Sequence, residues 1–523
     1  MVRDARERRD RSADPRAHGR RGARSERHEL STARLGAVLG ASAIISVGII
    51  AGRIAGVARD VVLARTLGIG PDADVAVLVL SFPDLLTTVL VGGAVSAVVI
   101  PDFKAAQATG GARRLFVTMI VLVGAATGLV AIAAAVGAPL FVRVLGPGLA
   151  EGTAARAVPL FALAAAVFPL TALAAVTTGY LQATGRFGVP AAGTLIFNAT
   201  LVAAVGLFVR PGALAAVAAG ALAGASLRWL SQLVAALRIR DAPGALPRRA
   251  RDLAGLARRY PEALGATSAI VLVPFAARTI ASFGATGDVA SLTYALRIVD
   301  FPLGSFITVG SVAALPHLAE LVVAHRRGEA ALLLADLLRV TAALTVPVTV
   351  ALVAAAGPLA ALLYGRGAAG PAAVEQIGSL AAVALLSLPA QGANAAFTAV
   401  YVADRRLGTA FVINALGALV AGERAGPRGI AAAYVALHWT LALVYIVDLR
   451  RARGLALASD ALPGIATAAL VGAAVVLPFV LVLTMVALSP APAVAVAAAG
   501  SIAGIAGALL VTYGRTPLRS WMF

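Results

Sequence analysis

Three charged residues lie close together in the first hydrophobic stretch of the chain, where a membrane-spanning helix normally has none. Arg53, Arg59 and Asp60 follow the apolar run 35–51. On insertion scales each charge near the bilayer centre costs about 2.5–3.5 kcal/mol, so three uncompensated charges would cost roughly 8 kcal/mol. A helix that keeps them is expected to point them into a wet cavity, where guanidinium groups bind anions.

The composition of the chain identifies the environment of these charges. The chain has 523 residues, of which 60% are hydrophobic, and its mean hydropathy is +0.90. Soluble proteins are about 45–50% apolar. Because apolar runs of about 20 residues recur, long enough to span a bilayer as helices, we expect an all-α polytopic membrane protein. About fourteen spans are predicted, at 35–66, 73–101, 115–143, 157–184, 190–209, 212–238, 261–284, 291–322, 333–356, 374–402, 408–422, 429–449, 462–487 and 491–513.

The distribution of basic residues predicts the orientation. The net charge of +19 lies mostly in the first 34 residues and in alternate loops, which indicates the positive-inside rule and not nucleic-acid binding. Residues 1–33 are predicted to be a disordered, basic cytoplasmic tail, because they lack large apolar side chains. With an even number of spans, both termini are expected in the cytoplasm, and the chain in the inner (plasma) membrane of a bacterial cell.

An internal repeat divides the chain. Residues 64–101 and 277–316 both contain Ala-Arg-Thr, a glycine-rich turn, Asp-Val-Ala, Phe-Pro and a final proline. The spacing corresponds to six spans, so the repeats are parallel and the substrate site is expected between two six-helix lobes. The predicted organisation is a tail (1–33), an N-lobe (34–240), a basic cytoplasmic linker (241–260), a C-lobe (261–450) and two extra helices with a short cytoplasmic tail (451–523).

Sites for enzyme chemistry are not visible in the sequence. There is no GxxxxGK[ST] phosphate-binding loop, no cysteine, and no metal-ligand spacing among the five histidines. We therefore expect neither a cofactor nor a metal, and a transporter in place of an enzyme.

Further intramembrane charges are expected to complete an anion site. Arg297 lies in the eighth span, with Asp300 one turn later as its expected partner. Asp60 can neutralise only one of Arg53 and Arg59, so a net positive cavity with arginines from both lobes is predicted, suited to a diphosphate. Gly52 and Gly56 predict either close helix packing or a bend. Snorkelling or pairing with a carboxylate is the expected state of Arg65 and Arg228.

Two stretches carry a family pattern. The first comprises Arg53-Ile-Ala-Gly-Val-Ala-Arg59-Asp60, Ala64-Arg65, Leu67-Gly68, Asp74, Phe82-Pro83-Asp84-Leu85-Leu86, and Gly93-Ala94 through Ser96 to Pro101. The second comprises Tyr294-Ala295-Leu296-Arg297, Pro302-Leu303-Gly304 and Leu315-Pro316. Together they resemble the MurJ (MviN) lipid II flippases of the multidrug/oligosaccharidyl-lipid/polysaccharide exporter superfamily, over residues 35–513.

The resemblance implies a fold and a site. It implies fourteen helices in two lobes, a solvated cavity, alternating access, and a lipid groove lined by the last two helices. The cavity arginines that bind the substrate diphosphate in the family match Arg53, Arg59 and Arg297, and its functional acids match Asp60 and Asp74. The expected partners are a lipid-linked glycan diphosphate, membrane lipids and cell-wall synthesis proteins.

The chain departs from the family pattern at the cavity rim. A basic pair and a glutamate in the second helix are replaced by Thr87, Thr88 and Gly92, and the acidic residue before Arg297 is Leu296. A seventh-helix acid that is linked to sodium in some members is Ala277. The expected function is a lipid II flippase, with the head group and the coupling ion left open. The alternatives are a flippase for another lipid-linked polysaccharide, a related multidrug exporter, or a non-transporting scaffold for cell-wall synthesis.

Overall fold

The computed structural model describes residues 44, 46–91, 94–239, 274–304, 317, 318, 320, 321, 324–403, 426–453 and 461–514. Within these residues the regular structure is helical, apart from isolated bridge residues at Gly110, Arg210 and Ala213. The predicted tail 1–33, the linker 241–260 and the span 408–422 lie outside the described residues. The all-α prediction is confirmed.

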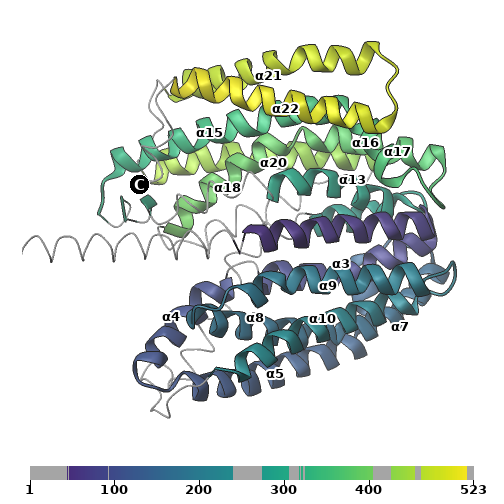
Figure 1. Cartoon of the computed structure of the whole chain (residues 1–523). Helices are drawn as coiled ribbons and strands as arrows, with labels where there is room; N and C mark the ends of the chain where they lie inside the picture. Colours follow the sequence, from purple (N-terminus) through teal and green to yellow (C-terminus); the bar gives the residue numbers. More distant parts are fainter. Residues whose placement is uncertain are drawn as a thin grey trace, which may run out of the picture.

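The first half of the chain forms one group of helices, here called the N-lobe, which is the lower group in Figure 1. Its members are a first helix at 46–67, α3 (Pro71–Val91), α4 (Ala94–Ala108), α5 (Ala112–Val136), α6 (Ala138–Leu145), α7 (Glu151–Ala165), α8 (Val167–Ala183), α9 (Gly188–Phe208) and α10 (Ala215–Leu237).

The second half forms the C-lobe, with two further helices on its far side (Figure 1). The C-lobe contains a helix at 274–281, α13 (Asp288–Pro302), α15 (Arg327–Ala354), α16 (Ala356–Tyr364), α17 (Pro371–Leu385), α18 (Leu388–Ala403) and α20 (Gly426–Arg453). The two further helices are α21 (Ala461–Met485) and α22 (Pro490–Tyr513), which pack on each other and on α15.

Prolines break the helices at corresponding places in the two lobes. Pro139 and Pro358 lie in the first turns of α6 and α16, directly after the ends of α5 and α15. Pro169 and Pro389 lie in the first turns of α8 and α18, directly after the ends of α7 and α17. Proline lacks an N–H group and is tolerated in the first turn of a helix but not in its interior. The two lobes therefore share a helix order as well as a sequence repeat.

The lipid-facing character of the bundle is visible in its helices. Seven helices of the described part are long and apolar enough to cross a membrane, or eight if the bent pair α17 and α18 counts as one span. Large apolar side chains such as Leu129, Ile132, Leu470 and Leu481 are exposed on α5 and α21. The chain is therefore a multi-pass membrane protein, and the number of fourteen spans stays a prediction.

Glycines seat the last two helices on the C-lobe. A Cβ on Gly472 of α21 or on Gly504 of α22 would lie 2.6 Å from the ring of Pro347 in α15. Because neither residue has a Cβ, both helices approach α15 closely at this proline, as small residues permit in membrane bundles. The pair is therefore docked on α15 and is not a separate unit.

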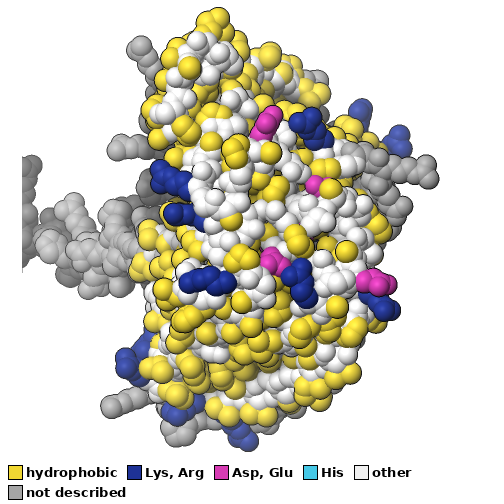
Figure 2. All heavy atoms as spheres, turned by 90° about the vertical axis from the view of Figure 1, so that its right-hand side faces the viewer, with side chains coloured by type: hydrophobic (Ala, Val, Ile, Leu, Met, Phe, Trp, Pro, Cys, Tyr) yellow, Lys and Arg dark blue, Asp and Glu magenta, His cyan; other side chains and the backbone are white. Residues whose placement is uncertain are grey.

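The two lobes meet at one end of the bundle, here called the joined end, which lies on the right of Figure 1. There, Ala368 N donates to Arg65 O at 2.8 Å and Gly148 N donates to Ser282 Oγ at 3.0 Å. Figure 2 looks onto this end and shows scattered basic side chains, some beside acidic ones, among apolar and backbone atoms. The hydrogen bonds that link described residues of the two lobes lie here or at the arginine cluster described below.

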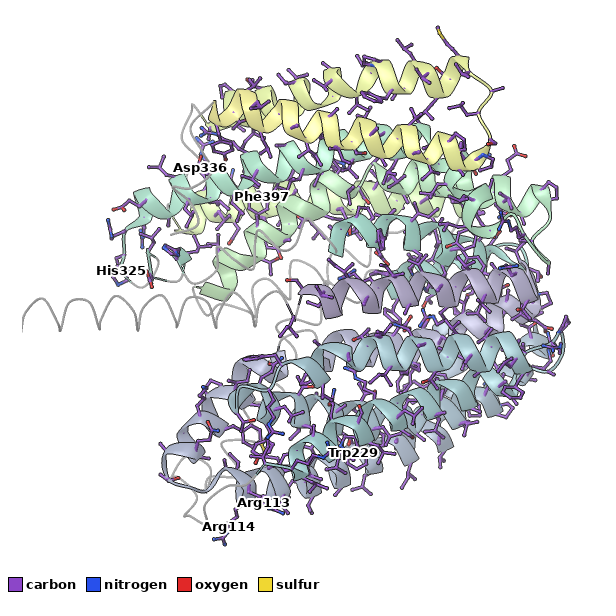
Figure 3. The ribbon with its side chains drawn as sticks, in the orientation of Figure 1. Arg113, Arg114, Trp229, His325, Asp336 and Phe397 are labelled. Atoms are coloured by element: carbon purple, nitrogen blue, oxygen red, sulfur yellow. The ribbon has the colours of Figure 1, made fainter. Side chains whose placement is uncertain are left out.

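The opposite end, here called the basic end, carries clustered arginines. Arg113 and Arg114 of the N-lobe and His325 of the C-lobe lie at this end in Figure 3. The described part of this end also includes Arg186, Arg238, Arg326, Arg327, Arg450 and Arg451. One end of the bundle thus joins the lobes and the other gathers positive charge.

Candidate functional site

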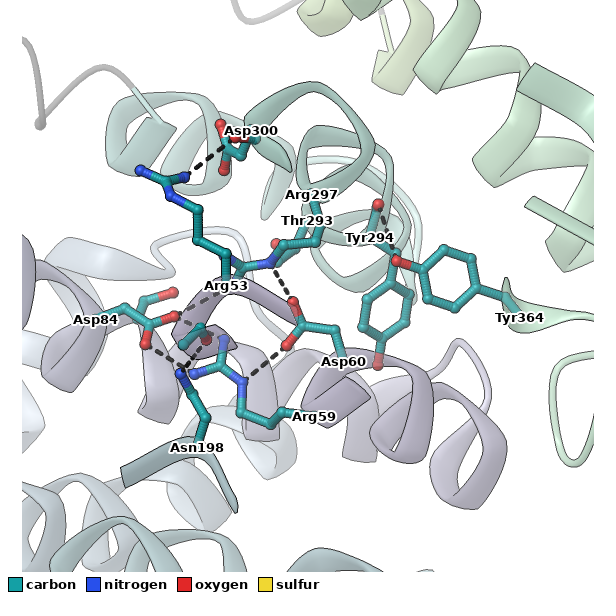
Figure 4. Close-up of polar contacts among 12 residues, drawn as sticks. Arg53, Arg59, Asp60, Asp84, Asn198, Thr293, Tyr294, Arg297, Asp300 and Tyr364 are labelled. Atoms are coloured by element: carbon teal, nitrogen blue, oxygen red, sulfur yellow. Dashed lines mark hydrogen bonds and ion pairs between the residues drawn. The ribbon is translucent and has the colours of Figure 1, made fainter. Parts of the chain in front are cut away.

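The centre of the molecule holds arginines and aspartates from both lobes in one cluster (Figure 4). Arg59, on the first helix, donates from Nε to Asp60 Oδ1 at 2.9 Å. Its two terminal nitrogens donate to the two carboxylate oxygens of Asp84, on α3, at 2.8 Å each. This two-point contact is the geometry in which guanidinium binds carboxylate or phosphate most strongly.

Arg297, on α13 of the C-lobe, completes the cluster. Its Nε donates to Asp60 Oδ2, and its Nη2 lies 3.5 Å from Asp84 Oδ2. The carboxylate of Asp60 is therefore shared between an arginine of each lobe. The expectation that Arg297 pairs with Asp300 is wrong, because the carboxylates of the N-lobe lie closer to its guanidinium group.

Arg53 lies beside the cluster at the end of α13. Its Nη1 donates to the backbone carbonyl of Asp300 at 3.2 Å. The guanidinium group fills the space that a Cβ on Gly304 would occupy, in a π-helical turn that follows α13. Arg53 therefore contacts the C-lobe through a backbone carbonyl group, and not through the carboxylates that bind Arg59.

Glycines set the position of the first helix. A Cβ on Gly52 would lie 2.8 Å from Thr194 Cβ of α9, and Asn198 Nδ2 donates to Gly52 O at 3.1 Å. The helix is continuous from 46 to 67. Of the two expected roles for Gly52, close packing is therefore the one observed. It is the partners on α3 and α13, and not a bend, that bring the charges together.

The formal charge of the cluster is nearly balanced. Arg59 and Arg297 face Asp60 and Asp84, and the neighbouring Arg53, Asp300 and Arg278 raise the total to four arginines and three aspartates. Arginines from both lobes were predicted, and so was a net positive cavity. The excess is one charge, because Asp84, which was not among the predicted site residues, offsets Arg278. The signal that could have identified Asp84 from the sequence is an acidic residue within an apolar helix.

Asp74 lies apart from this cluster, at the joined end. Its Oδ2 accepts from Gly287 N at 2.6 Å and its Oδ1 from Ala290 N at 2.8 Å. Gly287 is the N-cap of α13, with φ +97°, so Asp74 of the N-lobe caps a helix of the C-lobe. A carboxylate at a helix N-terminus is favoured by its free N–H groups and by the helix dipole. The structure does not bring Asp74 together with Arg53, Arg59, Asp60 and Arg297.

Two further arginines behave differently from each other. Arg65 is exposed, as snorkelling requires. Arg228 is only 2% exposed, and its Nε and Nη1 have no hydrogen-bond partner. The expectation that Arg228 snorkels or pairs is therefore wrong. Among the described residues, no three histidine or acidic side chains lie where they could hold a metal ion.

Two side chains of the cluster are buried and two are partly exposed. The side chains of Arg59 and Asp60 are 3% and 4% exposed, whereas those of Arg297 and Asp84 are 21% and 28% exposed. An anion entering the site therefore meets Arg297 and Asp84 first. The arrangement can exchange a carboxylate for another anion at two guanidinium groups that belong to different lobes.

Comparison with known proteins gives a consistent picture. The family model described as Lipid II flippase MurJ matches residues 63–508. The chain is similar to a probable lipid II flippase MurJ of Rhizobium meliloti, with 28% identity over 76% of this chain and 78% of the relative. It is also 28% identical to a lipid II flippase MurJ of Burkholderia cenocepacia, over 60% of this chain and 63% of the relative.

Solved structures show the same fold. A lipid II flippase MurJ in an inward closed conformation aligns with TM-score 0.74 and 19% identity, over 90% of this chain and 98% of that structure. An inward-facing multidrug resistance transporter of the MATE family aligns with TM-score 0.64 and 14% identity, over 79% of this chain. With the family model spanning most of the sequence, the chain belongs to the MurJ family of lipid II flippases.

Proposed function

We propose that this chain moves lipid II, an undecaprenyl-diphosphate-linked peptidoglycan precursor, from the cytoplasmic to the outer leaflet by alternating access. The observation that carries the proposal is the carboxylate of Asp60, which bridges Arg59 of the N-lobe and Arg297 of the C-lobe. A site built from both lobes changes shape when the lobes move, which is what an alternating-access carrier requires.

The arginines are the proposed ligands of the diphosphate. Arg59 and Arg297 each present a guanidinium fork, and forks bind phosphate oxygens in pairs. Arg53 lies next to them and adds a third cation. Asp60 holds Arg59 and Arg297 at the lobe interface, so its role is positioning. Asp74 closes the joined end through the N-terminus of α13.

The proposed orientation places the basic end in the cytoplasm, with both termini. Clustered arginines at one end support it by the positive-inside rule. In a bacterial plasma membrane the joined end then faces outward and the lobes are held together on that side. In this orientation, we infer that the carrier receives its substrate from the cytoplasmic side.

The remaining parts have proposed roles as well. The basic tail (1–33), which precedes the N-lobe (34–240), is assigned to the cytoplasmic surface. The linker (241–260), which connects the N-lobe to the C-lobe (261–450), is assigned to the same surface. The last two helices (451–523 with their tail) are assigned to the prenyl chain of the substrate. We further infer contacts with cell-wall synthesis proteins. The mechanism is a movement of lobes around a bound lipid and includes no covalent step.

A depletion experiment tests this function. Cells are depleted of the chain and complemented with the wild type, with Arg59→Ala, with Arg297→Ala, or with Arg65→Ala as an exposed-arginine control. Translocation of lipid II is followed by its accessibility at the outer leaflet. The wild type and Arg65→Ala are expected to restore it, and the two cluster variants are not. Normal translocation in depleted cells would overturn the proposal and favour the scaffold.

A second experiment addresses the other lipid-linked glycans and drugs. The purified chain is reconstituted in vesicles with lipid II, with a lipid-linked polysaccharide precursor, or with a cationic dye. Movement of lipid II alone supports the proposal. Export of the dye would instead indicate a multidrug exporter, whose cavity would use Asp60 and Asp84 as cation ligands.

A further inference from the structure

We propose that Asp84 is a built-in counter-anion that occupies the diphosphate site of the empty carrier and must be displaced before substrate binds. The inference rests on the proposed function and deepens it, because it identifies the group with which the substrate competes. Asp84 lies on α3, outside the set of arginines and acids that the sequence assigns to the site.

The contact geometry supports this role. Both oxygens of Asp84 lie 2.8 Å from the terminal nitrogens of Arg59, and one of them lies 3.5 Å from Arg297 Nη2. A phosphate group would use the same nitrogens in the same two-point manner. Asp84 therefore fills the positions that the substrate needs, on arginines of both lobes.

The burial of the side chains gives the order of events. Arg59 is 3% exposed, whereas Asp84 is 28% exposed. An anion that enters from solvent cannot reach the fork of Arg59 until the carboxylate of Asp84 has moved away. Asp60 differs, because it is 4% exposed and touches Arg59 through Nε, which leaves the terminal nitrogens to the ligand.

The backbone of α3 allows this movement. Pro83 directly precedes Asp84 inside the helix, and an interior proline removes one helical hydrogen bond and creates a bend point. The first half of α3, Ala73 to Leu80, is buried in the lobe cores. Asp84 can therefore move with the segment after Pro83 while Asp74 keeps its contacts at the joined end.

The exchange has two consequences for transport. When the substrate leaves, Asp84 can return to Arg59, so the buried terminal nitrogens of Arg59 are not left without an acceptor, which would be unfavourable. Because Asp84 occupies the site most of the time, the apparent affinity for any anion equals the intrinsic affinity multiplied by the fraction of time that the site is free. A bidentate charged contact of ordinary strength implies a reduction of about 10- to 100-fold, which keeps common simple anions out.

The test uses the full-length purified chain and inorganic pyrophosphate as the probe. Asp84→Asn is expected to lower the Kd for pyrophosphate at least about 10-fold by calorimetry. Asp72→Asn, on the same helix but at the joined end, is the matched control and should leave the Kd unchanged. A Kd for a folded Asp84→Asn protein that is within twofold of the wild type would overturn the proposal.

A chemical rescue removes the dependence on one variant. The chain has no cysteine, so Asp84→Cys carries a single thiol. Modification with a sulfonatoethyl thiosulfonate restores a negative charge at position 84, and modification with methyl methanethiosulfonate does not. The charged adduct should weaken pyrophosphate binding again, whereas the methyl adduct should stay tight. Equal Kd values for the two adducts would contradict the counter-anion role.

A lipid arm separates this inference from the proposed function. Undecaprenyl diphosphate and undecaprenol are compared in nanodiscs with the wild type and Asp84→Asn. Tighter binding of the diphosphate lipid alone by Asp84→Asn supports both proposals. If pyrophosphate binding responds to Asp84 but the wild type moves no lipid II, the function fails and the counter-anion stands. If lipid II moves and neither ligand responds to Asp84, only the counter-anion fails.

Discussion

The guanidinium group of Arg53 occupies the space that a Cβ on residue 304 would fill, so glycine at 304 is what gives this arginine its place. Gly304→Ala should push Arg53 off the carbonyl of Asp300. Since small displacements of binding groups cost up to about 100-fold in rate, we expect lipid II flipping in vesicles to fall about 10- to 100-fold.

Gly128→Ala is the control for this substitution. Gly128 lies in α5, and a Cβ there meets nothing within 4 Å. The change should leave flipping intact and stabilise the helix by about 0.5–1 kcal/mol. Wild-type flipping by Gly304→Ala would mean that the position of Arg53 is not required.

Asp74→Asn should loosen the joined end. Asn presents one oxygen to the N-terminus of α13 in place of a carboxylate, so one of two charge-assisted hydrogen bonds is lost. We expect the population with separated lobes at this end to rise about tenfold. Nitroxide labels on Glu151→Cys and Arg366→Cys, both exposed positions, report the distance by pulsed electron resonance.

Asp288→Asn is the matched control for Asp74. It occupies the equivalent place in the second repeat, but its oxygens accept from Ala285 N and Gln376 Nε2 within the C-lobe. The distribution of distances between the labels at 151 and 366 in Asp288→Asn should match the distribution in the labelled protein without this substitution. Identical distributions for both variants would show that Asp74 does not hold the lobes together.

Asp60→Asn should abolish function. The substitution removes one of the two carboxylates that Arg59 and Arg297 share, and it leaves Asp84 alone to face both guanidinium groups. Breaking a buried ion pair costs about 3–5 kcal/mol, so both thermal stability and complementation of depleted cells should be lost. Asp336→Asn, whose partly exposed pair with Arg339 lies within α15, should cost less than about 1 kcal/mol. Complementation by Asp60→Asn would contradict the shared role.

Arg228→Met should stabilise the protein. The guanidinium group of Arg228 is buried without a hydrogen bond to Nε or Nη1, and a methionine of similar length removes that desolvation cost. A gain of about 1–3 kcal/mol corresponds to a melting temperature several degrees higher, measured by thermal unfolding in detergent. Reduced flipping at an unchanged melting temperature would instead assign Arg228 a transport role.

The sequence predicted the fold because its signals are local. Apolar runs, alternating basic loops and the repeat each follow from short stretches of sequence. The helix breaks before Pro169 and Pro389 were not predicted, because 157–184 and 374–402 were each expected as one span. The convergence of Arg53, Arg59 and Arg297 was also predicted, because charged side chains within a membrane avoid the lipid and face the interior between the two lobes.

The partners of these arginines were not predicted, because they depend on packing between distant helices. Arg297 has an acid one turn away, Asp300, but binds Asp60 across the lobe interface. Asp84 gave no periodic signal, and its role follows only from where α3 lies. Arg228 contradicts the rule that buried charges are paired, and no pattern in the sequence distinguishes it from a snorkelling residue such as Arg65.

Each of the hydrogen bonds described at the joined end has a main-chain N–H group as its donor. Arg65 O, Ala368 N, Gly148 N and Gly287 N take part, and a Cβ on Gly148 would lie 2.2 Å from Ser282 O. Substitutions can therefore accumulate around this closure during evolution without opening it, except at Asp74 and Ser282, whose side chains accept hydrogen bonds, and at Gly148 and Gly287, which need to be glycine. A carrier whose closure is indifferent to most side chains is free to change its cavity for a new head group while keeping the same movement.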